Sequence, residues 1–236
     1  MDTLIALEGL YKAFTTHHLE KTIEPLKNMS FEVGKGEFMG IVGRSGSGKS
    51  TIIKCIYRTY LPTKGHIWYD SQAFGKVDLA TLSERQMTHL RKYEIGYVSQ
   101  FLSVMPRTTS LELVVQSLLE MGEDLTSATE KAKEALRHFA IPEKLWDSYP
   151  NTFSGGEKLR LNIACAIVKN PRLLLLDEPT ASLDNESKQK VREVIEKLKN
   201  AGTTMIGIFH DLEFMEGLCD YTYHMQTAEL EVMSGA

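Results

Sequence analysis

A glycine-rich run follows an apolar stretch and precedes a segment with helical spacing, which is the setting that a phosphate-binding loop requires. Glycines let the chain curl so that successive backbone N–H groups converge on an anion, at the positive end of a helix dipole. Lys49 would place a cation on the β- and γ-phosphates of a nucleotide, and the Ser50 hydroxyl is a natural Mg²⁺ ligand. The run therefore predicts a nucleotide and magnesium site made by Gly43, Arg44, Ser45, Gly46, Ser47, Gly48, Lys49, Ser50 and Thr51.

Two adjacent acids close the apolar run Leu173–Leu176. Asp177 would stand at the carboxyl end of a buried strand, from where its carboxylate reaches the magnesium shell beside the phosphate loop. Glu178 would then polarise the attacking water as a general base. An acidic pair after a strand is on its own most often a solvated turn. In a chain that also carries a phosphate loop, it predicts hydrolysis.

A third stretch, Phe153-Ser154-Gly155-Gly156-Glu157, directly precedes a segment with helical spacing. Ser154 would cap that helix, which makes its N-terminus a second place for an anion. The stretch stands about twenty residues before the acidic strand. Taken with the two motifs above, it resembles the signature of the ATP-binding cassette (ABC) family, which is usually Leu-Ser-Gly-Gly-Gln.

The resemblance implies an α/β fold: a P-loop NTPase of the ABC nucleotide-binding type, with an antiparallel β subdomain and a helical lobe at about 100–165. The cofactors that it implies are ATP and Mg²⁺. It also implies a head-to-tail dimer in which the signature of one subunit faces the phosphate loop of the other. The roles that follow are adenine stacking by Phe14, contact with Mg²⁺ and the attacking water by Gln100, sensing of the γ-phosphate by His210, and contacts in trans by Ser154, Gly155, Gly156 and Asp184.

Two residues depart from the family pattern. Glu157 stands where glutamine is usual, which adds a carboxylate near the γ-phosphate and bears on rate more than on role. Cys165 replaces an arginine that is common after the signature, which casts doubt on the packing of that helix.

Strands alternating with helices predict a parallel sheet covered on both faces. We expect a single domain over residues 1–236, without internal repeats. The polar stretch Thr15–Glu24, with His17 and His18, is typical of a solvated loop tip. Strands are expected at Leu4–Glu8, Met29–Val33, Glu37–Val42, His66–Tyr69, Ile95–Ser99, Leu173–Leu176 and Thr204–Phe209, and helices at Ser50–Tyr60, Ser83–Lys92, Ser110–Leu145, Gly155–Lys169 and Asn185–Asn200.

The composition narrows the class of protein. The chain has 236 residues, 42% of them hydrophobic, and a net charge of -4, so no global basic field draws it to nucleic acid. No apolar run approaches the roughly 18 to 20 residues that span a bilayer. The three cysteines have neither disulfide nor zinc spacing, which favours a reducing, cytoplasmic compartment.

The residues that follow Gln100 are expected to form the surface on which the partner protein docks and so to determine which partner the ATPase acts on. Here they resemble the ATP-binding L subunits of the phosphonate-degrading carbon–phosphorus lyase system, as do the stretches 55–62, 141–146, 152–157 and 206–211. On that resemblance the chain would be an accessory ATPase that associates with the lyase core and pairs with itself or a sister ABC subunit. Two alternatives stay open. One is the nucleotide-binding subunit of a lipoprotein-releasing or macrolide-export transporter, bound to a membrane permease and peripheral to the inner membrane. The other is a nucleotide-gated scaffold with little turnover.

Overall fold

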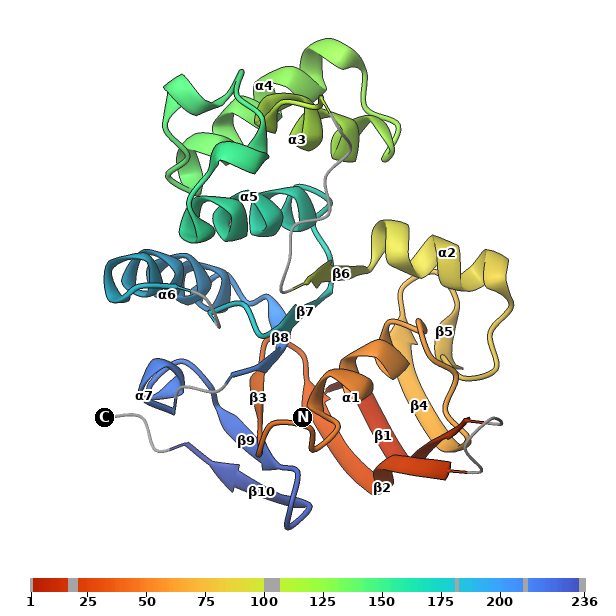
Figure 1. Ribbon diagram of the computed structural model, residues 1–236. Coiled ribbons are helices and arrows are strands. Elements are labelled where there is room, and N and C mark those ends of the chain that lie inside the picture. Colours follow the sequence, from red (N-terminus) through yellow and green to blue (C-terminus); the bar gives the residue numbers. More distant parts are fainter. Residues whose placement is uncertain (1, 17–20, 100–106, 181–182, 210–211, 234–236) are drawn as a thin grey trace.

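A mainly parallel sheet forms the centre of the computed structural model, which describes residues 2–16, 21–99, 107–180, 183–209 and 212–233 (Figure 1). The sheet has 6 strands in the order β10-β9-β3-β8-β7-β6. Three central strands are buried along their whole length, and their side chains are apolar on both faces except for Asp177 and Thr204, each of which stands at a strand end. The bounds are β3 Phe38–Val42, β6 Ile95–Val98, β7 Leu173–Asp177, β8 Thr204–Ile208, β9 Tyr221–His224 and β10 Glu229–Val232.

The two faces of this sheet pack against different layers. Leu173 and Leu175 belong to the apolar cluster shared with α1 (Lys49–Ile56), α2 (Glu84–Tyr93) and the second sheet. Leu174 and Leu176, which alternate with them, belong to the cluster shared with the helical lobe and α6 (Asn185–Asn200). Because both faces are covered, the side chains with access to a ligand lie at the ends of the strands.

A second, antiparallel sheet of 4 strands lies beside the first, in the order β2-β1-β4-β5 (Figure 1). The expectation of a loop over Thr15–Glu24 is wrong in part. β1 runs to Thr16 and β2 begins at Lys21, with Thr15 paired to Thr22. Strand pairing satisfies the backbone whatever the polarity of the side chains, and β-branched residues favour it. The bounds are β1 Thr3–Thr16, β2 Lys21–Gly34, β4 Lys64–Ser71 and β5 Gly75–Asp78; His17 and His18 lie outside the described residues.

The helical lobe stands apart from the antiparallel sheet, above β6 and α6 in the view of Figure 1. It contains α3 (Ser110–Leu119), α4 (Leu125–His138), two short 3₁₀ turns (Glu143–Leu145 and Pro150–Thr152) and α5 (Gly155–Ile167). A short helix, α7 (Leu212–Met215), precedes β9. Within the described ranges, no helix combines the length and the apolar character needed to cross a membrane.

Candidate functional site: a phosphate loop, an acidic pair and a second helix N-terminus

The phosphate loop connects β3 to α1, as the sequence predicts. Lys49 begins α1 and is 4% exposed; its ammonium group donates to the carbonyls of Gly43 at 2.8 Å and Arg44 at 3.1 Å. Two glycines are needed for different reasons. Gly48 has φ +97°, and a Cβ there would lie 2.4 Å from the Pro25 carbonyl oxygen. Gly46 has φ +78° in open space, so only its backbone conformation demands glycine.

A cavity of about 270 Å³ opens in front of this loop. Phe14 lines it from β1, and the aromatic ring is held edge-on by Tyr60 at 5.1 Å with the Lys12 ammonium 4.7 Å from its centre. The structure thus brings an aromatic side chain, the loop and one acid to the same space. The lining is Phe14, Ile23, Pro25, Gly46, Gly48, Lys49, Ser50, Thr51 and Glu178; among the described loop residues, Gly43, Arg44, Ser45 and Ser47 are not part of it.

The acidic pair stands at the carboxyl end of β7, which is separated from β3 by one strand, β8. Asp177 ends that strand and is 6% exposed. Its Oδ2 accepts a hydrogen bond from the Tyr97 hydroxyl at 2.9 Å, while its Oδ1 is buried with no hydrogen-bond partner among the described residues. Glu178 has φ +53°, a strained conformation for a residue with a side chain, and it faces the cavity.

The donor set fits a magnesium ion. Asp177 presents a buried, unsatisfied carboxylate oxygen, and Ser50 lies on the first turn of α1 beside the loop. Within the described chain, no group of three or more His, Cys, Asp or Glu side chains is placed to hold a metal. Such sparse protein ligation is what Mg²⁺ accepts, since the ion keeps several waters and takes further oxygens from phosphates.

Tyr97 is a site residue that sequence reasoning missed. It lies on β6, and burial, together with the nearby Asp177 charge, raises the pKa of this phenol well above its ordinary value. The hydroxyl is therefore protonated and donates to Asp177. No local signal marks the residue, because a tyrosine in a short apolar strand is typical of the core.

The signature stretch caps α5. The Ser154 backbone N–H and hydroxyl both donate to Glu157 Oε2 at 2.8 Å, and the Glu157 N–H donates back to the Ser154 hydroxyl at 3.3 Å. Burial acts to raise the pKa of Glu157, but the hydrogen bonds from Ser154 outweigh it, so this pKa lies below its ordinary value. The departure from glutamine thus produces a charged capping box.

Gly156 is required by helix packing. A Cβ on Gly156 would lie 2.8 Å from the Cβ of Ser187, in the first turn of α6. Asp184 caps α6 and accepts from the Ser187 N–H at 2.8 Å and from its hydroxyl at 3.2 Å. The structure thus joins Gly156 and Asp184 through Ser187. Ser154 and Gly155 are exposed, and none of these residues lines the cavity at the phosphate loop.

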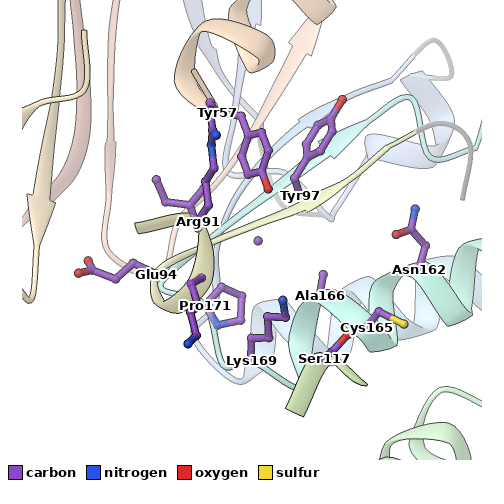
Figure 2. A pocket seen from close by; sticks show the side chains of 13 residues that line it. Tyr57, Arg91, Glu94, Tyr97, Ser117, Asn162, Cys165, Ala166, Lys169 and Pro171 are labelled. Carbon is purple, nitrogen blue, oxygen red and sulfur yellow. The ribbon is translucent and has the colours of Figure 1, made fainter. Parts of the chain in front are cut away.

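Two of the predicted catalytic residues, Gln100 and His210, lie outside the described residues. Ser99, which follows β6 and precedes Gln100, is tied to α5, because Asn162 donates to its carbonyl at 3.1 Å. α5 runs without a break through Cys165, so the cysteine leaves the helix intact. Burial raises the pKa of the Cys165 thiol to about 12. Cys165 lines a separate pocket of about 180 Å³ between α5 and β6, together with Tyr97 (Figure 2).

Fold and site together define a phosphate-loop nucleotide-binding protein with a helical lobe. The family profile described as ABC transporter matches residues 26–181. The chain is 35% identical over 221 residues to a putative peptide import ATP-binding protein of Brucella ovis, an alignment that covers 92% of this chain and 67% of the relative. It is 34% identical to the cell division ATP-binding protein FtsE of Bacillus subtilis, covering 90% of this chain and 88% of FtsE.

A similar cassette has been solved as a dimer. The chain superposes on the ATP-binding cassette MJ0796, in a post-hydrolysis state bound to ADP and Pi, with a TM-score of 0.88 and 28% identity over 99% of this chain and 100% of that one. The chain belongs to the ABC transporter ATP-binding family. It is an ABC ATPase, which uses ATP with Mg²⁺.

Proposed function

We propose that this chain hydrolyses ATP as one half of a head-to-tail dimer and that the resulting motion drives a separate protein. The observation that carries the proposal is the division of the site. The phosphate loop, Phe14 and Glu178 share one cavity, whereas Ser154 and Gly155 at the start of α5 are exposed and line no part of it. A second subunit would bring its signature to that cavity and close the nucleotide between the two chains.

Within each subunit we assign the chemistry as follows. Lys49 and the loop N–H groups hold the phosphates, and Ser50, Asp177 and Gln100 hold Mg²⁺. Glu178 takes a proton from the attacking water, and His210 contacts the γ-phosphate. Phe14 stacks on the adenine, while Ser154, Gly155, Gly156 and Asp184 act across the dimer interface.

The relatives support a membrane permease as the driven partner. They include a peptide import protein and the arginine transport protein ArtM of Bacillus subtilis, which is 35% identical over 94% of this chain and 87% of its own length. Of the two candidate partners, the permease has the broader support from the comparisons.

The residues after Gln100 support a second candidate, the core of carbon–phosphorus lyase. Ser99-Gln100-Phe101-Leu102-Ser103-Val104-Met105-Pro106-Arg107 resembles the L subunit (PhnL) of that system, as do Cys55–Pro62 and Ile141–Trp146. In this role the chain would associate with the lyase core, paired with itself or with a sister ABC subunit. None of the relatives described above is named for that system.

One purification separates the two candidates. The chain is tagged and isolated from its own cells with a mild detergent, and the proteins that accompany it are identified. A membrane permease supports the transporter function, and lyase subunits support the phosphonate function. ATP turnover is then measured for the chain alone and after addition of the recovered partner. Stimulation only by that partner supports the proposal that the two are coupled; turnover that no partner alters contradicts it.

The catalytic assignment has its own test. Glu178→Gln keeps the size of the side chain but removes the base, so phosphate release should fall at least a hundredfold while ATP binding persists. Unchanged phosphate release in this variant would show that hydrolysis does not run through Glu178.

A further inference from the structure

Asp177, the proposed magnesium ligand, accepts a hydrogen bond from a side chain on the neighbouring strand. Tyr97 lies on β6, which runs parallel to β7 with Tyr97 opposite Leu175. Its hydroxyl reaches two residues further along β7 and donates to Asp177 Oδ2 at 2.9 Å. The contact joins residues 80 positions apart in the chain and lies at the carboxyl edge of the sheet, where the phosphate loop also begins.

The hydrogen bond makes the two oxygens of Asp177 unequal. Oδ2 is held by Tyr97, whereas Oδ1 is buried without a hydrogen-bond partner in the described part of the chain. A buried carboxylate oxygen without a donor is costly, and a cation is the partner that removes that cost. The tyrosine therefore determines which oxygen is left for the metal.

The Tyr97 ring is itself held in place. It stacks on Tyr57, at the end of α1, with ring centres 4.8 Å apart and planes 26° from parallel. The Arg91 guanidinium lies 5.0 Å from the centre of the Tyr57 ring, and it donates to the carbonyls of Tyr57 and Arg58, each at 2.9 Å. Figure 2 shows the two tyrosines side by side, with Arg91 next to Tyr57, at one wall of the pocket beside α5. This packing leaves the hydroxyl little freedom.

We propose that Tyr97 is a positioning residue for magnesium: it fixes the Asp177 carboxylate so that Oδ1 faces the ion. The inference rests on the proposed role of Asp177 as a metal ligand. Hydrogen bonds that orient a metal ligand typically change metal affinity tenfold to a hundredfold when they are removed. Tyr97 touches neither nucleotide nor water in this role and acts only through Asp177.

The test compares ATP affinity with and without Mg²⁺, measured calorimetrically in the non-hydrolysing Glu178→Gln background. Tyr97→Phe keeps the ring and its stack but removes the donor. We expect its ATP affinity in EDTA to match that of the parent, while the gain in affinity on adding Mg²⁺ falls roughly tenfold or more. Tyr57→Phe is the matched control, since it alters the stacked partner and leaves the bond to Asp177 in place.

The outcomes separate this inference from its premise. A purely structural role of Tyr97 would lower the thermal midpoint of unfolding and leave the gain from Mg²⁺ unchanged, which overturns the proposal. An equal loss in Tyr57→Phe would assign the effect to the stack and overturn it as well. If Asp177→Asn also left the gain from Mg²⁺ unchanged, the metal role of Asp177 itself would fail, and Tyr97 would have no ligand to position.

Discussion

Glu157 and the phosphate of ATP would compete for the hydroxyl proton of Ser154. Ser154 donates that proton to Glu157 Oε2 at 2.8 Å in the free chain, and the same hydroxyl is proposed to contact ATP bound by a second subunit. A hydroxyl has a single proton to donate. Replacing Glu157 by Gln, the residue usual in the family, should therefore weaken the internal bond and favour the ATP-bound dimer.

The chain contains the glutamine form of the same capping box, which shows that the hydrogen-bond pattern survives when the acceptor is neutral. At the start of α2, the Ser83 hydroxyl donates to the Gln86 oxygen at 2.7 Å, and the Ser154 hydroxyl donates to Glu157 at 2.8 Å, so these two bonds differ in the charge of the acceptor and not in length. The backbone N–H of Ser83 lies 3.2 Å from the Gln86 oxygen, and that of Ser154 lies 2.8 Å from the Glu157 oxygen. Hydrogen bonds to charged groups contribute about 1.5–3 kcal/mol and neutral ones about 0.5–1.5 kcal/mol. The substitution should thus weaken the hydrogen bond that ATP has to displace from the Ser154 hydroxyl by about 1 kcal/mol at each site. With two sites in a homodimer, the ATP-dependent dimer should be roughly thirtyfold tighter.

The same substitution should destabilise the fold of the free subunit even though it strengthens the dimer. Glu157 is a negative charge at the positive end of α5, and such charges stabilise a helix by about 0.3–1 kcal/mol. Glu157→Gln should lower the free energy of unfolding in urea by about 1–2 kcal/mol, because the weaker capping hydrogen bond and the lost interaction with the helix dipole act in the same direction. An assay for one effect therefore cannot be mistaken for the other.

Dimerisation is measured by sedimentation of both forms in the Glu178→Gln background, with and without MgATP. Glu112 provides the matched control. It occupies the same position in the capping box of α3, where the Thr109 N–H donates to it at 2.7 Å. Glu112→Gln should lower stability in the same direction and leave dimerisation unchanged. A dimer that is no tighter in Glu157→Gln than in the parent would refute the proposed competition for the Ser154 proton.

Three further predictions follow from burial and from the cavity. Burial raises the pKa of the Cys55 thiol to about 11 and that of Cys219 to about 12, so at pH 8 roughly one Cys55 thiol in a thousand is ionised. Alkylation of both should be far slower in the native protein than in urea; equal rates would contradict their burial. Leu175→Ala, at a fully buried position of β7, should lower the free energy of unfolding by about 2–5 kcal/mol in a urea titration, and a loss below about 1 kcal/mol would contradict the packing. Phe14→Ala should weaken ATP binding about tenfold, since base stacking on an aromatic ring contributes about 1–3 kcal/mol. Tyr11 stands three residues earlier on β1 and does not line the cavity, so Tyr11→Ala should not weaken binding; equal losses in a fluorescence titration would reject Phe14 as the stacking residue.

The sequence by itself determined the parts of the protein that are local. The phosphate loop and the acidic pair are contiguous runs, and each carries its chemistry within a few residues, so both could be placed before the fold was known. The expected helix Asn185–Asn200 matches α6 at both ends, because the Asp184 cap and the apolar spacing lie within the segment itself. Fully buried strands such as β7 were also predictable, since a short uninterrupted apolar run bounded by polar residues is typical of a buried strand.

Pairings between distant segments were decided only by the tertiary structure. The polar ends of β1 and β2 are strands because they pair with each other, and no local pattern encodes that pairing. β10 was missed for the same reason: it is exposed along its length and is held by its pairing with β9. The bond from Tyr97 to Asp177 depends on β6 lying next to β7, an adjacency set by the packing of the whole sheet. Spacing along the chain predicted the proposed reacting groups, and the order of the strands decided that the Tyr97 hydroxyl contacts one of them.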